Sequence, residues 1–277
     1  MTDSTALPAR KTVRWPFAPK DGFSLLQEPD RLLMIHSLPG ILVWPSLLFA
    51  LAILFQLVST GIWSALGGPD FIVSLQTMQF GGSAVAYGML ALLMWHHFGI
   101  YAAHRPAFSV IPRRVSEAGA AALVLVFMLT LAGPITLWFH EFAMMDFSQT
   151  LAGGVELSEV SNVDNIVQSG ADLWAIVLLT LIAAPLVEEI LFRGWMLPML
   201  IARGVPGLFA VLISGAAFGL IHIGQGLMVM TSTCLLGIAL GVARLITGRV
   251  AAPVLGHVAN NAWAIFAIPA LTGMHAG

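Results

Sequence analysis

Charge is scarce in this sequence, and the scarcity decides the solvent in which the chain folds. Asp, Glu, Lys and Arg make up 9% of its 277 residues, whereas soluble domains carry about 25%. Hydrophobic residues make up 58% and occur in continuous runs of helix-spanning length rather than in short alternating segments. Only helices and closed barrels satisfy every backbone polar group in lipid, and continuous apolar runs favour helices. The composition therefore predicts an all-α, polytopic membrane helical bundle and argues against a soluble domain.

Several common functional signals are also missing. The single cysteine, Cys234, excludes an internal disulfide and a cysteine-rich zinc site. The formal net charge is −2 and no basic face is present, so we expect no nucleic-acid partner. The sequence has no P-loop, GxGxxG, HExxH or GxSxG motif, and no signal-peptide pattern. Any chemistry must therefore come from polar residues within the apolar segments.

Seven hydrophobic segments predict about seven transmembrane helices. They cover residues 38–62, 80–103, 118–140, 171–192, 207–223, 226–246 and 250–270. Residues 1–36 differ, because they carry five of the basic residues and four prolines, and we expect them to form a basic cytosolic tail. Residues 37–277 then form a single transmembrane domain. Small residues in SGAAFG (214–219) and GVPG (204–207) are typical of close helix packing.

The distribution of basic residues predicts the orientation. With the amino terminus in the cytosol, the cytosolic pieces are the tail and residues 104–117, 193–206 and 247–249. All twelve Lys and Arg residues then lie on the cytosolic side, with Arg244 at a helix end, and the connections 63–79 and 141–170 contain acids but no Lys or Arg. The positive-inside rule thus places the amino terminus inside and the carboxyl terminus outside. The long, acidic 141–170 connection is either a lid or a short amphipathic element.

VEEILFRGW, residues 187–195, places two glutamates and an arginine beside an apolar run, where each charge is unfavourable in hydrocarbon. On a helix, Glu189 and Arg193 share a face and can form an ion pair, whereas Glu188 is turned about 100° away and has no such local partner. Pro185 weakens the helix just before them and frees backbone groups. Intramembrane acids usually face a wet cavity and serve function, which favours a functional Glu188. A purely structural pair remains the alternative for Glu189 and Arg193.

Two further polar groups lie on later segments. Phe218 and His222 in AAFGLIHIG share one helix face, and so do His257 and Asn261 in GHVANNAW. A lone histidine in an apolar helix is usually a packing residue, and His and Asn often form hydrogen bonds between membrane helices. Together, however, one acid, two histidines and one amide from three helices are sufficient for hydrolysis.

These three groups resemble the motifs of the CPBP family, the CaaX proteases and bacteriocin-processing enzymes, also called the Abi family of intramembrane proteases. The EExxxR, FxxxH and HxxxN motifs match, in order, Glu188, Glu189 and Arg193, then Phe218 and His222, then His257 and Asn261. The resemblance covers roughly residues 170–265, where the catalytic motifs lie. It implies endopeptidase activity on a membrane-associated substrate. That substrate is a prenylated CaaX carboxyl terminus in the Ras-converting branch, and a peptide or membrane protein in many bacterial members.

The chemistry of peptide hydrolysis assigns roles to these residues. We assign Glu188 as the general base, with His222 helping to hold the attacking water. His257 and Asn261 are expected to donate hydrogen bonds to the oxyanion. The remaining motif residues, which we expect to hold the helices in position, are Glu189, Arg193 and Phe218.

No cofactor is favoured, but a zinc mechanism stays open. Glu188, His222 and His257 could supply two nitrogens and one oxygen, a common ligand set for a catalytic zinc, and members of the family are often labelled metalloproteases. Glu189 would then have to be the base, although its spacing ties it to Arg193.

The motifs can meet only under one geometric condition. His222 lies sixteen residues beyond Pro206, roughly 22–24 Å along a helix, so a straight helix would carry it toward the outer face. Glu188 and His222 come together only if WMLPMLIA, residues 195–202, is still within the membrane. We expect that arrangement.

Two other functions are compatible with the sequence. A non-catalytic membrane scaffold or regulator would bind a membrane protein partner and would use the motif residues structurally. A transporter would use Glu188 as a proton relay, but no second half with similar polar breaks is present, as repeats in many transporters would require. We expect an integral, multi-pass protein of a bacterial cell membrane whose partners are the lipid bilayer and a membrane protein or peptide substrate. The oligomeric state is left open.

Overall fold

The structure is a computed structural model that describes residues 38–99, 109–139, 141, 170–202 and 204–267. Every regular element within these residues is a helix, so the predicted all-α fold class is confirmed. The predicted tail, residues 1–36, and residues 142–169 of the predicted lid or amphipathic connection lie outside the described residues.

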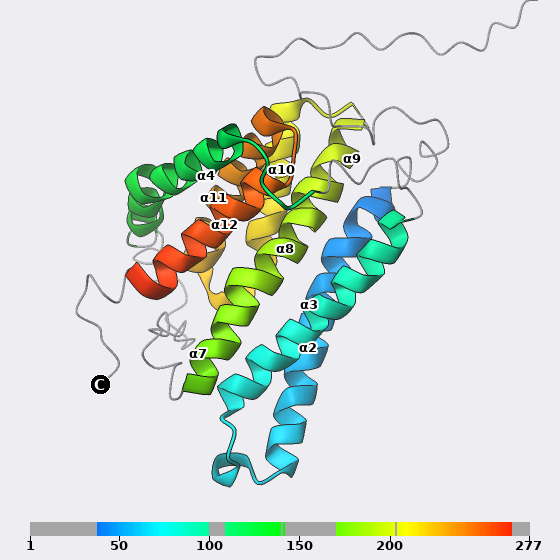
Figure 1. Ribbon diagram of the computed structural model, residues 1–277, viewed down its shortest axis with the longest axis vertical. Helices are drawn as coiled ribbons and strands as arrows, with labels where there is room; N and C mark the ends of the chain where they lie inside the picture. The colour runs from blue at the N-terminus through cyan, green and yellow to red at the C-terminus, as the bar shows by residue number, and fades with distance from the viewer. Residues whose placement is uncertain (1–37, 100–108, 140, 142–169, 203, 268–277) are drawn as a thin grey trace, which may run out of the picture.

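The helices follow one another as the hydrophobic segments predict (Figure 1). The amino-terminal hairpin consists of α2 (Leu38–Ala65), the short η3 (Gly68–Asp70) and α3 (Leu75–Gly99). The third segment starts with α4 (Val115–Phe127) and η5 (Met128–Ala132). The fourth is one long helix made of α7 (Gly170–Val177), η6 (Leu178–Ala183), α8 (Ala184–Glu189), η7 (Ile190–Met196) and α9 (Leu197–Ala202). The last elements are α10 (Gly207–Leu220), η8 (Ile223–Gln225), α11 (Leu227–Thr247), α12 (Ala251–Ala262) and η9 (Trp263–Ala267).

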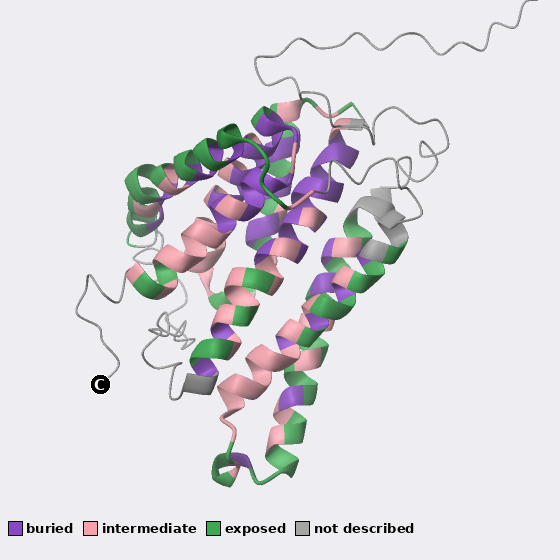
Figure 2. Ribbon diagram, in the orientation of Figure 1, coloured by how far each residue is buried: buried purple, intermediate pink, exposed green. Residues whose placement is uncertain are grey.

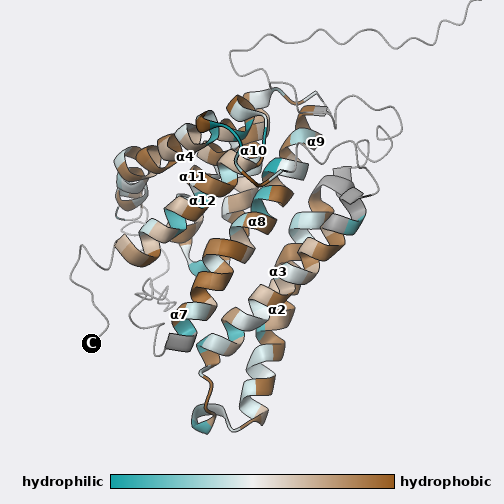
Figure 3. Cartoon of the chain, viewed as in Figure 1, coloured by the Kyte–Doolittle hydropathy of each residue, from teal (hydrophilic) through white to brown (hydrophobic). Residues whose placement is uncertain are grey.

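Length and composition qualify five of the described helical segments to cross a membrane. These are Leu42–Ala65, Leu75–Met94, Val115–Phe139, Asp172–Ile201 and Leu227–Thr247. The apolar helix Gly207–Leu220 is shorter. Apolar residues cover the long helices in Figure 3, and many large ones are exposed, for example Leu57, Leu92 and Leu123, as expected where lipid replaces water. The chain is therefore an integral, multi-pass membrane protein.

The fourth segment differs from the prediction at its end. The expected helix stops at residue 192 and a cytosolic loop, 193–206, contains Arg193, but the structure continues the helix to Ala202 and buries every residue from 191 to 200. Arg193 does not force the helix out of the bundle because its charge is satisfied inside it, as described below. The condition that WMLPMLIA belongs to the spanning helix is met, since Asp172–Ile201 forms one candidate span.

Proline positions explain where the helices of the third and fourth segments contain wider, π-helical turns. Each of the π-helical segments η5, η6 and η7 ends two residues before a proline, namely Pro134, Pro185 and Pro198. The residue between them donates its N–H five residues back, as Ala184 does to Leu179 O and Leu197 does to Phe192 O. A proline ring clashes with the carbonyl four residues earlier, and one wider turn moves that carbonyl away.

In this register the proline lacks the N–H that would bond the next carbonyl. In the fourth segment, the carbonyls left without that donor are Thr180 O, five residues before Pro185, and Arg193 O, five residues before Pro198. In lipid such a carbonyl needs a substitute donor, because no water is available to it.

Close contact between α10 and α11 fixes the carboxyl-terminal bundle. A Cβ added at Gly215 would lie 2.6 Å from Ile238 Cγ1, and one at Gly219 would lie 2.7 Å from Met230 O. The close packing expected for SGAAFG is thus confirmed. In GVPG the prediction of close packing is wrong at Gly204, because a Cβ there would meet no atom within 4 Å. The φ of 90° at Gly204 shows that this glycine forms a turn instead.

The fourth segment runs through the middle of the molecule, with the α2–α3 hairpin on one side and α10, α11 and α12 on the other (Figure 1). Buried residues gather in its second half and in the adjacent carboxyl-terminal helices (Figure 2). Leu191, Phe192 and Leu197 are fully buried there. All three sequence motifs therefore lie in, or at the edge of, the core.

Candidate active site

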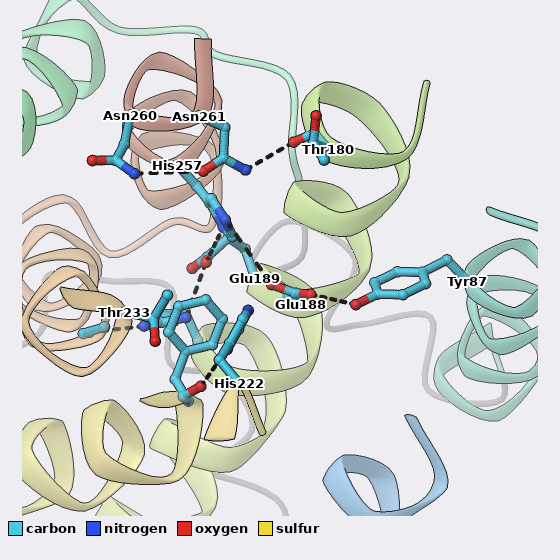
Figure 4. A network of polar contacts seen from close by, with 12 residues as sticks. Tyr87, Thr180, Glu188, Glu189, His222, Thr233, His257, Asn260 and Asn261 are labelled. Atoms are coloured by element: carbon cyan, nitrogen blue, oxygen red, sulfur yellow. Dashed lines mark hydrogen bonds and ion pairs between the residues drawn. The ribbon is translucent and has the colours of Figure 1, made fainter. Parts of the chain in front are cut away.

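Glu188 lies at the end of α8 with 2% of its surface exposed. The Tyr87 hydroxyl, on α3, donates a hydrogen bond of 2.5 Å to Glu188 Oε1 (Figure 4). The other carboxylate oxygen, Oε2, lies 4.0 Å from His257 Nε2 on α12. That distance is too long for a direct hydrogen bond and suits a bridging water. Glu188 thus faces the bundle interior and lies between two helices remote in sequence.

Glu189 accepts two contacts on one oxygen. Arg193 Nη1 and His257 Nδ1 each lie 2.9 Å from Glu189 Oε1, and all three side chains are buried. The predicted ion pair between residues four apart is confirmed. The contact with His257 was not predicted, because it joins residues 68 positions apart.

Arg193 joins three helices although its side chain is fully buried. Its Nη2 donates a 2.8 Å hydrogen bond to Gly237 O on α11, and its guanidinium carbon lies 4.6 Å from the centre of the Phe218 ring on α10. A Cβ at Gly237 would come within 3.1 Å of Nη2, so the glycine leaves room for the cation. The pair with Glu189 is accordingly not isolated in hydrocarbon.

Phe218 is the ring around which the two histidines are arranged. Its centroid lies 5.0 Å from His222 and 5.6 Å from His257, both in edge-to-face geometry. His222 Nδ1 lies 2.8 Å from Phe218 O and must donate, because a carbonyl oxygen only accepts. That leaves His222 Nε2 for other partners. Figure 4 shows the contacts of His257 with the two glutamates, and His222 nearby with its hydrogen bond to Phe218 O.

Asn261 makes a helix-to-helix contact. Its Nδ2 donates a 2.8 Å hydrogen bond to Thr180 O, one of the two carbonyls deprived of a donor by a proline (Figure 4). Asn260 Nδ2 lies 3.4 Å from Asn261 Oδ1 and orients the amide. One N–H of Asn261 is therefore used between helices, as the hydrogen-bonding alternative of the sequence predicts, and its second N–H is not part of that bond.

Arg244 supplies the substitute donor for the carbonyl that Pro198 leaves without one. The side chain is fully buried near the end of α11, and its Nε donates a 3.0 Å hydrogen bond to Arg193 O. The carbonyl freed by Pro198 thus has a donor, and it comes from the carboxyl-terminal helices, as at Thr180.

Of the four predicted catalytic residues, Glu188 and His257 lie 4.0 Å apart, His222 is linked to them only through Phe218, and Asn261 is hydrogen-bonded to Thr180 O on the motif helix. Sequence reasoning missed Tyr87 and Thr180. Tyr87 is one of only two tyrosines in the chain, and an isolated tyrosine in the apolar stretch AVAYGML is a signal that could have indicated it. Thr180 contributes a backbone oxygen, which no side-chain motif reveals.

The residues as placed do not fit a zinc site. Within the described part of the chain, no three His, Cys, Asp or Glu side chains come together in a set able to hold a metal ion. His257 Nδ1 is engaged with Glu189 and His222 Nδ1 with Phe218 O, so each ring has only its Nε2 left to bind a metal.

One known family matches part of the chain. Residues 170–263 match the model of the Rce1-like family, described as type II CAAX prenyl endopeptidase Rce1-like. The matched region spans the fourth segment through the end of α12 and contains every motif residue named above, but not Tyr87. No curated protein and no solved structure gives a significant match. The recognition of a CPBP-type protein from its motifs is confirmed over this region, and it supports a CAAX-type intramembrane endopeptidase in general.

Proposed function

We propose that this chain, Rce1-like over residues 170–263, cleaves a membrane-associated or lipidated peptide or protein with a water molecule activated by Glu188. The observation that carries the proposal is the position of Glu188 Oε2. This oxygen belongs to a buried carboxylate, is opposite to the one bound by Tyr87, and lies 4.0 Å from His257 Nε2. A water held between these atoms is within reach of the base on one side and, when the His257 ring carries protons on both nitrogens, of a hydrogen-bond donor on the other.

The reaction follows from these groups. Glu188 takes a proton from the water, whose oxygen attacks the carbonyl carbon of the scissile peptide bond. The C=O bond opens to a tetrahedral oxyanion. Glu188 then passes the proton to the amide nitrogen, the C–N bond breaks, and the products are a carboxylic acid and an amine. His222 assists through Nε2 by holding the water, since its Nδ1 is used on Phe218 O.

His257 is the main oxyanion donor. The contact between Nδ1 and Glu189 fixes the ring, so that Nε2 faces the reaction site when it carries a proton. Glu189 is itself held by Arg193. A donor fixed in advance stabilises a developing oxyanion without reorganisation, and removing one such donor commonly lowers the rate about 10²–10³-fold.

Asn261 contributes in two ways. Its bond to Thr180 O fixes α12 against the motif helix, and the N–H outside that bond is the second oxyanion donor. The side-chain amide therefore both positions the helix and takes part in charge stabilisation.

The orientation and location follow the charge pattern. We place the amino terminus in the cytosol and the protein in a bacterial cell membrane. Glu188 then lies near the middle of the candidate span Asp172–Ile201, and Arg193 lies five residues nearer to the cytosolic end of that span.

The test compares membranes containing the wild type, Glu188→Gln or the control Glu141→Gln, whose side chain is exposed. New peptide termini are mapped by proteomics, and the peptides found are then presented to the purified protein in liposomes. We expect wild type and Glu141→Gln to generate the same termini and Glu188→Gln to generate none of them. Identical termini in all three would refute the protease and favour the scaffold, whose phenotype would survive Glu188→Gln but not deletion.

A further inference from the structure

The motifs of the matched region do not complete the environment of the base. Tyr87 lies on α3, outside residues 170–263, and donates a 2.5 Å hydrogen bond to Glu188 Oε1. We infer that Tyr87 is a positioning residue for the general base and that the amino-terminal hairpin is part of the active site. This inference rests on the proposed function, because it assigns Tyr87 to the same reaction.

The hydrogen bond distinguishes the two oxygens of the carboxylate. The terminal torsion of a glutamate has a broad, roughly two-fold minimum, so an unrestrained carboxylate samples many orientations. The Tyr87 hydroxyl fixes Oε1, and Oε2 is then directed toward His257 Nε2 at 4.0 Å. Without the hydroxyl the carboxylate can rotate, and the water loses its defined position between the base and the proton donor.

The hydroxyl is itself held in place, because α3 is attached to the motif helix at a second point. Ser74 and Thr77, at the start of α3, both donate hydrogen bonds to Oδ1 of Asp172 in α7. Ala86 and Leu90, on either side of Tyr87, are 1% and 0% exposed. The two attachments fix α3 along the helix that carries Glu188.

α2 packs closely against α3. A Cβ at Gly82 of α3 would lie 3.2 Å from Phe55 O and still closer to Ser59 Oγ, so the two helices of the hairpin are in direct backbone contact. The hairpin therefore acts as a packed unit that presents Tyr87 to the base. A similar arrangement could not be built from residues 170–263 alone.

The experiment measures the cleavage of a peptide identified as above, in liposomes, by wild type, Tyr87→Phe and Thr77→Val. Tyr87→Phe removes one hydroxyl and keeps the ring. Thr77→Val removes one hydroxyl from the same helix at the distant attachment, where Ser74 still holds Asp172. We expect Tyr87→Phe to lower kcat roughly 10- to 100-fold with KM changed less than about twofold. Thr77→Val should leave both constants within about twofold of the wild type, and both variants should be as abundant and as folded as the wild type.

Each of the other outcomes contradicts either the positioning role of Tyr87 or the proposed function. If Tyr87→Phe cleaves as fast as the wild type, Tyr87 does not position the base, while the proposed function stands. If it cleaves faster, Tyr87 restrains the base instead. If Thr77→Val loses as much kcat as Tyr87→Phe, the effect comes from docking of α3 and not from the bond to Glu188. If the wild type cleaves no peptide, the proposed function fails, and the positioning role fails with it.

Discussion

Arg193→Met tests whether the buried charges are balanced as the structure describes. The guanidinium donates to Glu189 Oε1 and Gly237 O, and it packs on the Phe218 ring. Methionine keeps much of the aliphatic volume but none of these hydrogen bonds. Glu189 would keep only His257 as a partner on Oε1. Breaking a buried ion pair by removing one member costs about 3–5 kcal/mol, because the other charge stays buried.

The assay is reversible unfolding in mixed micelles, with Arg113→Met as the matched control. Arg113 is exposed, and Glu117 accepts its backbone N–H and not its side chain. We expect Arg193→Met to lower the free energy of unfolding by about 3–5 kcal/mol and Arg113→Met to change it by less than about 0.5 kcal/mol.

A double variant separates the charge from the packing. In Glu189→Gln/Arg193→Met neither buried charge remains, so part of the loss should be recovered, by about 0.5–3 kcal/mol. Equal destabilisation by Arg193→Met and Arg113→Met would refute the reasoning. A double variant no more stable than Arg193→Met would show that packing on Phe218, and not the unpaired carboxylate, dominates.

Three further predictions concern the helices and the metal. Asn261→Ala should destabilise the fold and abolish cleavage. Adding Pro185→Ala, which supplies an N–H for Thr180 O, should recover the free energy of unfolding but not the cleavage rate. Recovery of both would show that Asn261 serves only as a contact between helices. Gly219→Ala should lower the unfolding midpoint, because its Cβ would lie 2.7 Å from a backbone oxygen. Gly88→Ala should raise the midpoint slightly, because its Cβ would meet no atom within 4 Å and alanine favours a helix more than glycine does. Equal shifts of the two midpoints would contradict the close packing at Gly219. A strong zinc chelator should leave the cleavage rate unchanged, and a loss that added Zn²⁺ reverses would establish a metal mechanism.

Sequence patterns predicted the parts of this fold that depend on local spacing. Apolar runs gave the order of the helical segments, and the four-residue spacing gave the pair of Glu189 and Arg193. The end of the fourth segment was wrong, because a charge is normally a sign of a helix end. Arg193 is instead paired with Glu189, four residues away, and hydrogen-bonded to Gly237 O, 44 residues away. The sequence alone does not indicate that Gly237 lies near Arg193.

The same limit applies to the candidate site. The motifs placed four side chains on three helices, but not the two polar bonds that orient them. Tyr87 meets Glu188 across 101 positions, and Asn261 meets a backbone oxygen across 81. Such contacts depend on how whole helices pack, and a π-helical register can be recognised only once the hydrogen bonds around Pro185 are known.

The two carbonyls deprived of donors by Pro185 and Pro198 have a consequence for biogenesis. Their substitute donors, Asn261 and Arg244, belong to α12 and α11, which follow the motif helix in the chain. Until those helices pack, Thr180 O and Arg193 O lack these donors, and Glu189 lacks its contact with His257. We therefore expect the motif helix to be stable in the bilayer only after α11 and α12 have packed against it.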